Sequence, residues 1–327
     1  MSDGMVRVGF LGTGGIARWG HFGHLSKWPD VKLAAFCDVN AEAAGKAAQE
    51  FGGKAYTDPQ AMLRDEALDA LYVCVPPFAH GEAEIQAAAG KIALFVEKPL
   101  GVDLAFPRRV RDAIAKAGAV SAVGYNWRAA DITGKAQALL AGKPVSAAFG
   151  YWVGGMPGVM WWRQQAQSGG QLNEQATHVV DVARCLIGGK VVRVYAQGAK
   201  GICAQRVEKH DVHDNAVALL TFDNGCVCAI GSGHLSPQGF RVGLDLILDG
   251  MTLSHNNSEL RVKHEKGEEV YRCLNKPYEA EDRAFIDAVK RGDPRGVICS
   301  YAEAFETHRV TMAANESMRT GKVVEIE

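Results

Sequence analysis

Two short segments of this 327-residue chain carry side chains that can bind or move a proton. The first is Glu97-Lys98-Pro99-Leu100, which directly follows an apolar run. The second is the stretch GGQLNEQATHVVD, in which Glu174, His178 and Asp181 are spaced i, i+4 and i+7 and would share one face of a single helix. Histidine has an unperturbed pKa of about 6.5, close to working pH, and a lysine can stabilise negative charge that develops on an oxygen. The residue types therefore predict general acid–base chemistry.

A glycine-rich turn near the N-terminus predicts a second kind of site. Gly12-x-Gly14-x-x-Ala17 lies between the apolar run Val6–Leu11 and a predicted helix. Glycine permits a tight turn and lets backbone N–H groups approach a pyrophosphate at the helix N-terminus. Asp38 ends the second predicted strand, where a carboxylate can accept hydrogen bonds from an adenosine ribose. The two features together predict a dinucleotide site, with a purely structural glycine turn as the alternative. Because the charge of Asp38 would repel a 2′-phosphate, the expected cofactor is NAD, and NADP is the alternative.

Two pairs of histidines have a spacing that is compatible with metal binding. His21 and His24 lie three residues apart in the first predicted helix, and His210 and His213 lie three apart in a polar loop with flanking aspartates. We interpret the first pair as solvent-exposed or cleft-lining and the second as part of an exposed loop or site rim. No metal site is therefore expected, and metal binding is the alternative for each pair.

The first third of the chain alternates short apolar runs with alanine-rich amphipathic stretches, a rhythm typical of a parallel sheet with crossover helices. Strands are predicted over 6–11, 32–38, 70–75, 92–97 and 119–125, and helices over 16–27, 41–51, 80–89 and 104–117. Near-continuous apolar strands such as LYVCV suit a sheet that is covered on both faces. We predict an α/β fold with a doubly wound parallel sheet in residues 1–124.

From about Asn126 the pattern changes to longer strand-like segments, separated by hairpin turns such as Asp223-Asn224-Gly225 and Asp249-Gly250. Helices are predicted over 174–186, 279–291 and 301–319. Residues 125–327 are therefore predicted to form an α+β domain, in which helices cover one face of a large, mostly antiparallel, open-faced sheet.

Composition excludes several classes of partner. Hydrophobic residues make up 47% of the chain, charged residues 22%, and the formal net charge is −1, so neither nucleic acid nor a membrane surface is an expected partner. No apolar run approaches the ~20 residues of a membrane span, and the N-terminus lacks the features of a signal peptide. The eight cysteines are scattered without any C-x-x-C pair, which favours buried reduced thiols, with disulfides or zinc binding as the alternative. A cytoplasmic location is therefore expected.

Further segments carry a resemblance to a known family. They are Val75-Pro76-Pro77-Phe78-Ala79-His80, the Glu97-Lys98-Pro99-Leu100 segment, Gly124-Tyr125-Asn126, the glycine loop and the 169–181 segment. Together they resemble the glucose-fructose oxidoreductase / inositol dehydrogenase family over essentially the whole chain. The resemblance implies a Rossmann domain, an open-faced sheet domain that often mediates oligomerisation, and nicotinamide-dependent oxidation of sugars, cyclitols and related polyols. A homodimer or homotetramer is expected.

The resemblance also implies roles for single residues. Lys98 matches the active-site lysine and His178 the catalytic histidine, while Glu174 stands where family members commonly have aspartate. We assign His178 as the base, Glu174 as its partner or a substrate hydrogen bonder, and Lys98 as the donor to the substrate oxygen. Asp181 is expected to be structural. The residues expected near the cofactor are Gly12, Gly14, Gly15, Ile16, Asp38, Val75, Pro76, His80, Glu97, Lys98 and Asn126.

Aromatic and cationic side chains are the candidates for substrate binding. Indoles stack on the C–H faces of sugar rings, and arginine can donate two hydrogen bonds to hydroxyl or carboxylate oxygens. The candidates are Tyr125, Trp127, Arg128, Trp162 and Arg163. The alternative is that the aromatic residues fill a core or an oligomer interface.

Two other functions remain open on the same residues. One is a redox-neutral, NAD-dependent glycoside hydrolase, which oxidises a sugar transiently, eliminates a substituent and reduces the sugar again. The other is a non-catalytic module that senses a nicotinamide or a sugar. Retention of Lys98 and His178 favours an enzyme over a sensor, because a sensor does not require proton-transfer groups.

Overall fold

The computed structural model describes residues 4–327, which divide into two compact units. Unit 1 contains the chain up to Leu100 together with Ala105–Asn126 and Pro277–Phe305, and unit 2 contains Gly101–Leu104, Trp127–Lys276 and Glu306–Glu327. The predicted division at residue 125 differs from this arrangement in one main respect. Residues 277–305, predicted as part of the second domain, belong to unit 1.

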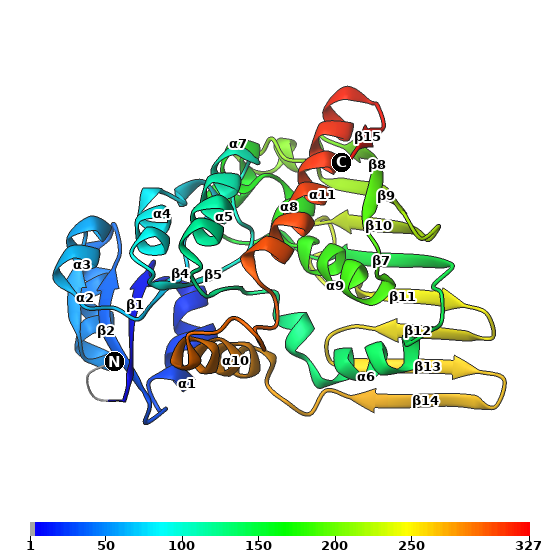
Figure 1. The fold of residues 1–327 in the computed structure, drawn as a ribbon. Helices are drawn as coiled ribbons and strands as arrows, with labels where there is room; N and C mark the ends of the chain where they lie inside the picture. The colour runs from blue at the N-terminus through cyan, green and yellow to red at the C-terminus, as the bar shows by residue number, and fades with distance from the viewer. Residues whose placement is uncertain (1–3) are drawn as a thin grey trace. The chain divides into compact units, whose positions relative to one another are not determined.

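Unit 1 is built on a six-stranded parallel sheet with the order β3-β2-β1-β4-β5-β6, and Figure 1 shows helices beside it. The order reverses between β1 and β4, as in doubly wound sheets. The strands are β1 (Val6–Leu11), β2 (Val31–Cys37), β3 (Lys54–Tyr56), β4 (Ala70–Val73), β5 (Ala93–Val96) and β6 (Ser121–Val123). The helices are η1 (Ala17–Phe22), α1 (Gly23–Leu25), α2 (Ala41–Phe51), α3 (Pro59–Asp65), η2 (Pro77–Ala79), α4 (Glu82–Ala89), α5 (Ala105–Ala117) and α10 (Pro277–Arg291).

A row of aromatic side chains crosses this sheet and explains why α10 packs in unit 1. Phe10 pairs in register with Phe36 on one side and Tyr72 on the other, and Tyr72 pairs with Phe95. The rings of Tyr72 and Phe95 stack at 4.7 Å, and Phe285 of α10 contacts both edge-on at 5.6 and 5.5 Å. Burying aromatic area of this kind is among the larger contributions to a core.

Unit 2 is built on a nine-stranded sheet with the order β14-β13-β12-β11-β7-β10-β9-β8-β15, in which only β7 and β10 are parallel among the described pairs. The strands are β7 (Ala147–Val153), β8 (Val191–Ala199), β9 (Asn215–Phe222), β10 (Val227–Gly233), β11 (Arg241–Leu248), β12 (Met251–His255), β13 (Glu259–His264), β14 (Gly267–Arg272) and β15 (Val324–Glu325). The mostly antiparallel sheet is confirmed.

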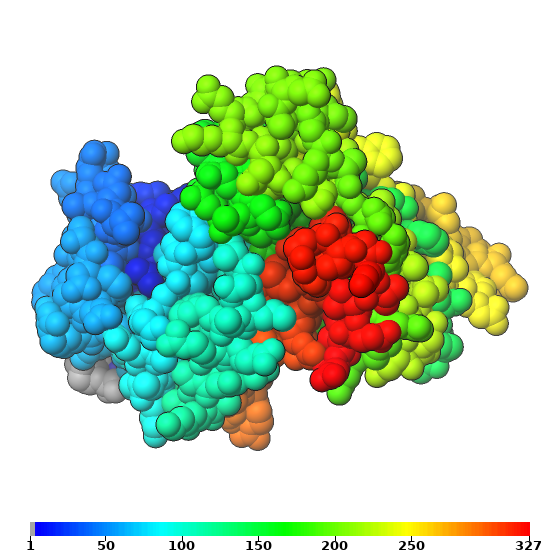
Figure 2. Space-filling view, turned by 90° about the horizontal axis from the view of Figure 1, so that it is seen from above, coloured from blue at the N-terminus to red at the C-terminus, as the bar shows by residue number. Residues whose placement is uncertain are grey.

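Helices lie along one face of the nine-stranded sheet, as Figure 1 shows for α6 (Asp131–Leu140) and α9 (Thr177–Ile187). The remaining helical segments of unit 2 are most of η3 (Asn126–Ala129), η4 (Met160–Arg163), α7 (Gln165–Ser168), α8 (Gln171–Glu174), η5 (Cys203–Gln205) and most of α11 (Tyr301–Thr320). The C-terminal residues, red in Figure 2, lie on the surface of unit 2, where β15 pairs with β8.

The helix predicted over 174–186 is interrupted in the structure. Glu174 ends α8, and α9 begins at Thr177 after a turn at Gln175 and Ala176. Glu174 and His178 therefore belong to two different helices, and the expected single stripe of Glu174, His178 and Asp181 is wrong.

Candidate active site

The residues expected near the cofactor all belong to unit 1, where they follow the carboxyl ends of parallel strands. Gly12 follows β1, Asp38 follows β2, Val75 and Pro76 come shortly after β4, Glu97 and Lys98 follow β5, and Asn126 comes shortly after β6. Carboxyl ends of parallel strands meet at one edge of a sheet, and open α/β sheets bind ligands along that edge. The sheet therefore brings these residues to one edge, as the sequence pattern requires.

The glycine loop has the geometry of a phosphate-binding turn. Gly12 adopts φ +90°, and a Cβ atom there would lie 2.4 Å from the carbonyl oxygen of Cys74. Around Gly14 and Gly15, in contrast, an added Cβ would meet no atom within 4 Å, so the backbone at these two positions is open to a ligand. The loop leads directly into the helical segment η1, whose first residue follows Ile16. This cradle fits the pyrophosphate of a dinucleotide.

Asp38 is held in place beside the glycine loop. Its Oδ2 atom accepts hydrogen bonds from the backbone N and the Oγ1 of Thr13, at 2.8 and 3.0 Å. Its Oδ1 atom accepts from the backbone N of Asn40 at 2.9 Å. A carboxylate offers about four lone-pair directions, so Asp38 keeps acceptor capacity for a ribose hydroxyl.

Lys98 is half-buried immediately after β5, and its peptide bond to Pro99 is cis. His80 holds this segment: its Nε2 donates to the carbonyl oxygen of Pro99 at 3.1 Å, and its Nδ1 lies 2.9 Å from Oε1 of the buried Glu84. The contacts of His80 therefore anchor the chain next to Lys98 to the start of α4.

Glu97 belongs to a buried ionic network that sequence reasoning missed. His21 lies 3.1 Å from Oε1 of Glu97 through its Nε2 and 2.8 Å from Oδ2 of Asp282 through its Nδ1, and His24 contacts the same Asp282 oxygen at 2.6 Å. His21 is fully buried, so its interpretation as solvent-exposed or cleft-lining is wrong. Asp282 lies on α10, far away in the sequence, and no local pattern connects it with His21.

The charges of this network follow from its geometry. Burial opposes a charged imidazole, yet the carboxylates of Asp282 and Glu97 raise the pKa of His21 to about 10. Burial likewise opposes the Asp282 carboxylate, and the two histidines nevertheless lower its pKa. The two carboxylates thus favour the charged form of His21, in which both ring nitrogens donate hydrogen bonds.

His178 lies near the start of α9 in unit 2 and is 6% exposed. Its imidazole packs nearly parallel to the indoles of Trp127 and Trp152, with ring centroids 6.3 and 5.6 Å apart. Trp127, a candidate for substrate binding, thus also packs against His178, the candidate base. Tyr125, another candidate, is buried in unit 1.

Asp181, one turn further along α9, pairs with Arg128. The guanidinium Nε and Nη2 donate to the two carboxylate oxygens at 2.6 and 2.8 Å, and Thr307 Oγ1 donates to Oδ1 at 2.8 Å. Both charged side chains are at most 9% exposed. Asp181 thus has a structural role, because it binds α9 to Arg128. We interpret Arg128 as a positioning residue.

Glu174 accepts a hydrogen bond from Nε1 of Trp162 at 2.7 Å. Trp162 is fully buried, and its ring contacts His234 edge-on at 4.9 Å. We therefore interpret Trp162, a candidate for sugar stacking, as a positioning residue for Glu174. The neighbouring Arg163 donates from Nη1 to the Met160 sulfur at 3.3 Å.

Comparison with known proteins identifies the family. The family model described as "Oxidoreductase family, NAD-binding Rossmann fold" matches residues 6–125, and the "GFO/IDH/MocA C-terminal domain" model of the same family matches residues 138–254. The chain belongs to this oxidoreductase family. Unit 1 therefore carries its NAD-binding domain, NAD is the cofactor, and the chain is a nicotinamide-dependent oxidoreductase.

Members of the family with assigned names are similar over most of the chain. The scyllo-inositol 2-dehydrogenase (NAD(+)) of Bacillus subtilis (strain 168) is 25% identical over 98% of this chain and 96% of its own. The myo-inositol 2-dehydrogenase of Thermotoga maritima is 28% identical over 89% and 90%. A crystal structure of a probable dehydrogenase from Thermotoga maritima has a TM-score of 0.82 at 26% identity and 98% coverage of both chains. Within residues 4–327, no helix is long and apolar enough to cross a membrane.

Proposed function

We propose that this protein is a dehydrogenase that transfers a hydride from a secondary hydroxyl carbon of a sugar, cyclitol or related polyol to NAD. The observation that carries the proposal is the position of Lys98, a half-buried cation at the carboxyl end of β5, on the sheet edge that also holds the open glycine loop after β1. A lysine there can donate to an oxygen near the reactive end of the cofactor. The two inositol dehydrogenases among the relatives support the polyol class.

The residues of this chain have separate tasks in that reaction. Oxidation of an alcohol requires a group that removes the hydroxyl proton and a group that stabilises the oxygen while its charge develops. We assign the first task to His178 and the second to Lys98. Glu174, which Trp162 holds in place, orients His178 or binds a substrate hydroxyl. When bound, NAD supplies the hydride acceptor.

The preference for NAD over NADP rests on Asp38. The carboxylate is fixed beside the glycine loop by its bonds to Thr13 and Asn40, so it cannot swing away from a 2′-phosphate without losing them. The adjacent Val39 is 98% exposed and carries no cation that would offset the repulsion.

We also propose that the open face of the nine-stranded sheet mediates a homodimer or homotetramer. In register across the sheet, Tyr195 pairs with Leu219, Leu219 with Ala229, and Ala229 with Phe149. Tyr195, Leu219 and Phe149 are 37%, 45% and 44% exposed, so they form an apolar row on the surface of unit 2. A cytoplasmic location is supported by the eight free cysteines, a usage typical of reducing compartments.

The proposed function is tested by following reduced nicotinamide in the near ultraviolet. Purified protein is mixed with NAD or NADP and a panel of inositols, aldoses, glycosides and sugar acids. We expect NAD reduction with at least one polyol or sugar and a weaker signal with NADP. Binding of NAD without reduction by any compound of the panel would contradict the proposal.

A further inference from the structure

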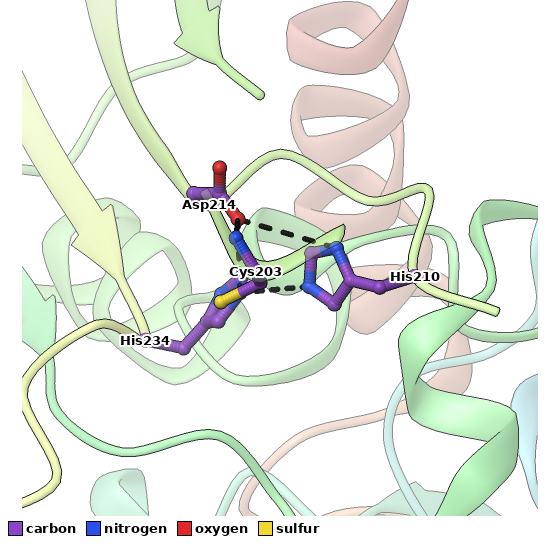
Figure 3. A group of neighbouring side chains, drawn as sticks. All are labelled: Cys203, His210, Asp214 and His234. Carbon is purple, nitrogen blue, oxygen red and sulfur yellow. Dashed lines mark hydrogen bonds and ion pairs between the residues drawn. The ribbon is translucent and has the colours of Figure 1, made fainter. Parts of the chain in front are cut away.

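A buried cluster of side chains in unit 2 contains none of the residues assigned to the reaction above. Cys203 lies on η5, His210 and Asp214 lie in the loop before β9, and His234 directly follows β10. All four residues are buried, and each offers a donor atom that lies within 4.8 Å of the other three. Figure 3 shows the four side chains turned toward one another.

The spacing of the donor atoms is close to that of a tetrahedral metal site. Zn–N bonds of about 2.0–2.1 Å and Zn–S bonds of about 2.3 Å place tetrahedral ligands roughly 3.3–3.6 Å apart. The Nε2 atoms of His210 and His234 lie 3.0 Å apart, and Oδ1 of Asp214 lies 3.8 Å from the same His234 atom. The 4.0 Å approach of Asp214 to His210 involves the other ring nitrogen, Nδ1, and one donor atom from each of the four residues lies within 4.8 Å of the others. Small side-chain movements would therefore suffice to surround an ion.

The donor set indicates which ion it would hold. Imidazole and thiolate favour zinc and the neighbouring late transition metals, whereas magnesium and calcium favour oxygen. One thiolate, one carboxylate and two neutral imidazoles balance the charge of a divalent cation, as burial requires. Four protein ligands without an open position are typical of a structural zinc site.

Hydrogen bonds already orient the ligands. The Asp214 carboxylate accepts from the backbone N of Ile202 at 2.8 Å and from that of Cys203 at 3.1 Å. The backbone N of His234 donates to the carbonyl oxygen of Asp214 at 3.2 Å. Such outer contacts fix ligand orientation in known metal sites.

We propose that Cys203, His210, Asp214 and His234 bind one divalent ion of the zinc class that fastens the loop of residues 200–214 to the end of β10. As the metal–sulfur bond forms, the Cys203 thiol releases its proton to solvent. This inference departs from the expectation that the chain has no metal site. His213, which sequence spacing pairs with His210, is not part of the cluster.

The ion would also stiffen the support of Glu174. The backbone N of Asp211, within the fastened loop, donates to the carbonyl oxygen of Arg163 at 3.0 Å, and Asp211 Oδ1 accepts from the backbone N of Gln165 at 2.6 Å. On the other side, His234 packs against Trp162, the donor to Glu174. The loop, the ion and the segment 162–165 would thus form one rigid support.

The test uses the full chain, stripped with a chelator and then loaded with Zn(II) or Co(II). We expect about one equivalent of zinc per chain by elemental mass spectrometry, and with Co(II) a thiolate charge-transfer band with intense tetrahedral ligand-field bands. Cys203→Ser and His234→Gln should each weaken zinc binding at least ~100-fold, more than loss of an outer contact does. His213→Gln and Cys185→Ser, which alter the same residue types outside the cluster, should retain both signals.

X-ray absorption at the zinc edge of the wild-type protein keeps the test independent of whether the variants fold. We expect one sulfur among nitrogen and oxygen neighbours. Chelation should lower the melting temperature of the wild type, because an ion that binds only the native state stabilises it. A wild-type chain that retains neither Zn(II) nor Co(II), or unchanged metal content in both cluster variants, would overturn the proposal and leave a hydrogen-bonded polar cluster only.

Discussion

Lys98 and His178 are held by the fold in different ways, and each way suits its assigned task. Lys98 follows β5 in a segment anchored by the contact of His80 with Pro99. His178 is limited in rotation because its ring lies flat against two indoles, while α9 is anchored through Asp181 and Arg128. Pre-positioned groups of this kind lose little entropy when the substrate binds.

Replacing either residue should therefore slow the reaction rather than unfold the protein. Lys98→Ala and His178→Ala are each expected to lower kcat by roughly 100-fold or more, the usual scale for a positioned acid or base. The measurement is steady-state NAD reduction with a substrate identified from the panel. Lys116→Ala and His264→Ala, at positions outside the site, are the matched controls and should keep wild-type rates. Near wild-type turnover in both site variants would refute the assignments.

At the scale of elements, the turn between β1 and η1 makes Gly12 irreplaceable. A Cβ there would meet the Cys74 carbonyl oxygen at 2.4 Å, which is a backbone atom and cannot rotate away, and φ is +90°. We expect Gly12→Ala to lower the free energy of unfolding by about 1–3 kcal/mol, the cost of a residue held in a disfavoured conformation, and to weaken NAD binding. Urea denaturation and titration calorimetry with NAD measure the two effects.

Gly45→Ala provides the control for this glycine. Gly45 lies inside α2, and an added Cβ meets no atom within 4 Å. Because alanine is the better helix former, this variant should gain up to about 1 kcal/mol and bind NAD unchanged. Equal stability of the two glycine variants would contradict the structural account of the turn.

The network that joins η1 to α10 predicts a pH dependence of stability. The pKa of His21 is raised from 6.5 to about 10 in the folded protein, so its contribution is complete below pH 6.5 and is lost as the pH rises toward 10. The lowered pKa of Asp282 has the opposite sign: its contribution is present above pH 3.8 and is lost as the pH falls further. Between these limits both His21 and Asp282 are charged.

We therefore expect the free energy of unfolding to fall as the pH rises from 6.5 to 10, by no more than about 1.4 kcal/mol per pH unit for this proton. Urea denaturation of the wild type and of His21→Gln across this range isolates the histidine, because cysteine ionisation is common to both proteins. The difference in the free energy of unfolding between the wild type and His21→Gln should become smaller as the pH rises. A constant difference would show that His21 does not carry the charge assigned to it.

For the molecule as a whole, the alternation of apolar runs predicts much of the architecture. Strand β1 and helix α2 have the predicted bounds, and β2, β4, β5 and β6 begin and end within about two residues of their predicted positions. Short elements such as β3 and α3 were missed, because three exposed or half-buried strand residues carry no apolar pattern. Residues 277–305 pack in unit 1 through the aromatic contacts of Phe285. These contacts join residues far apart in the sequence, so no local sequence pattern predicts them.

In the candidate active site, too, local patterns predict some residues, and other contacts arise only in the folded chain. Motifs placed Gly12, Asp38 and Lys98 at strand ends, because strand ends follow from local patterns. The donor to Glu174 lies 12 positions away in the sequence, and Arg128 and Asp181 lie 53 positions apart, so only the folded chain brings these partners together. The cluster around Cys203 is likewise assembled from the loop of residues 200–214 and the residue that follows β10.

The open face of unit 2 predicts the oligomeric state. Leu219→Asp places a charge in the middle of the apolar row with Tyr195 and Phe149, and burying an unpaired charge is costly. We expect the wild type to be a dimer or tetramer by light scattering and this variant to dissociate to monomers. Leu274→Asp, at an 87% exposed loop position, should leave the mass unchanged. A monomeric wild type would exclude this role of the sheet.

In the proposed reaction a hydride moves from a polyol carbon to NAD and leaves the protein with the reduced cofactor. The most direct measurement uses the active polyol with deuterium at the carbon to be oxidised, and mass spectrometry of the nicotinamide after turnover. We expect reduced cofactor that carries one deuterium, together with the corresponding ketone. Deuterium retained in a product that has lost a substituent, with no net reduction of NAD, would contradict the proposed reaction and indicate the redox-neutral hydrolase.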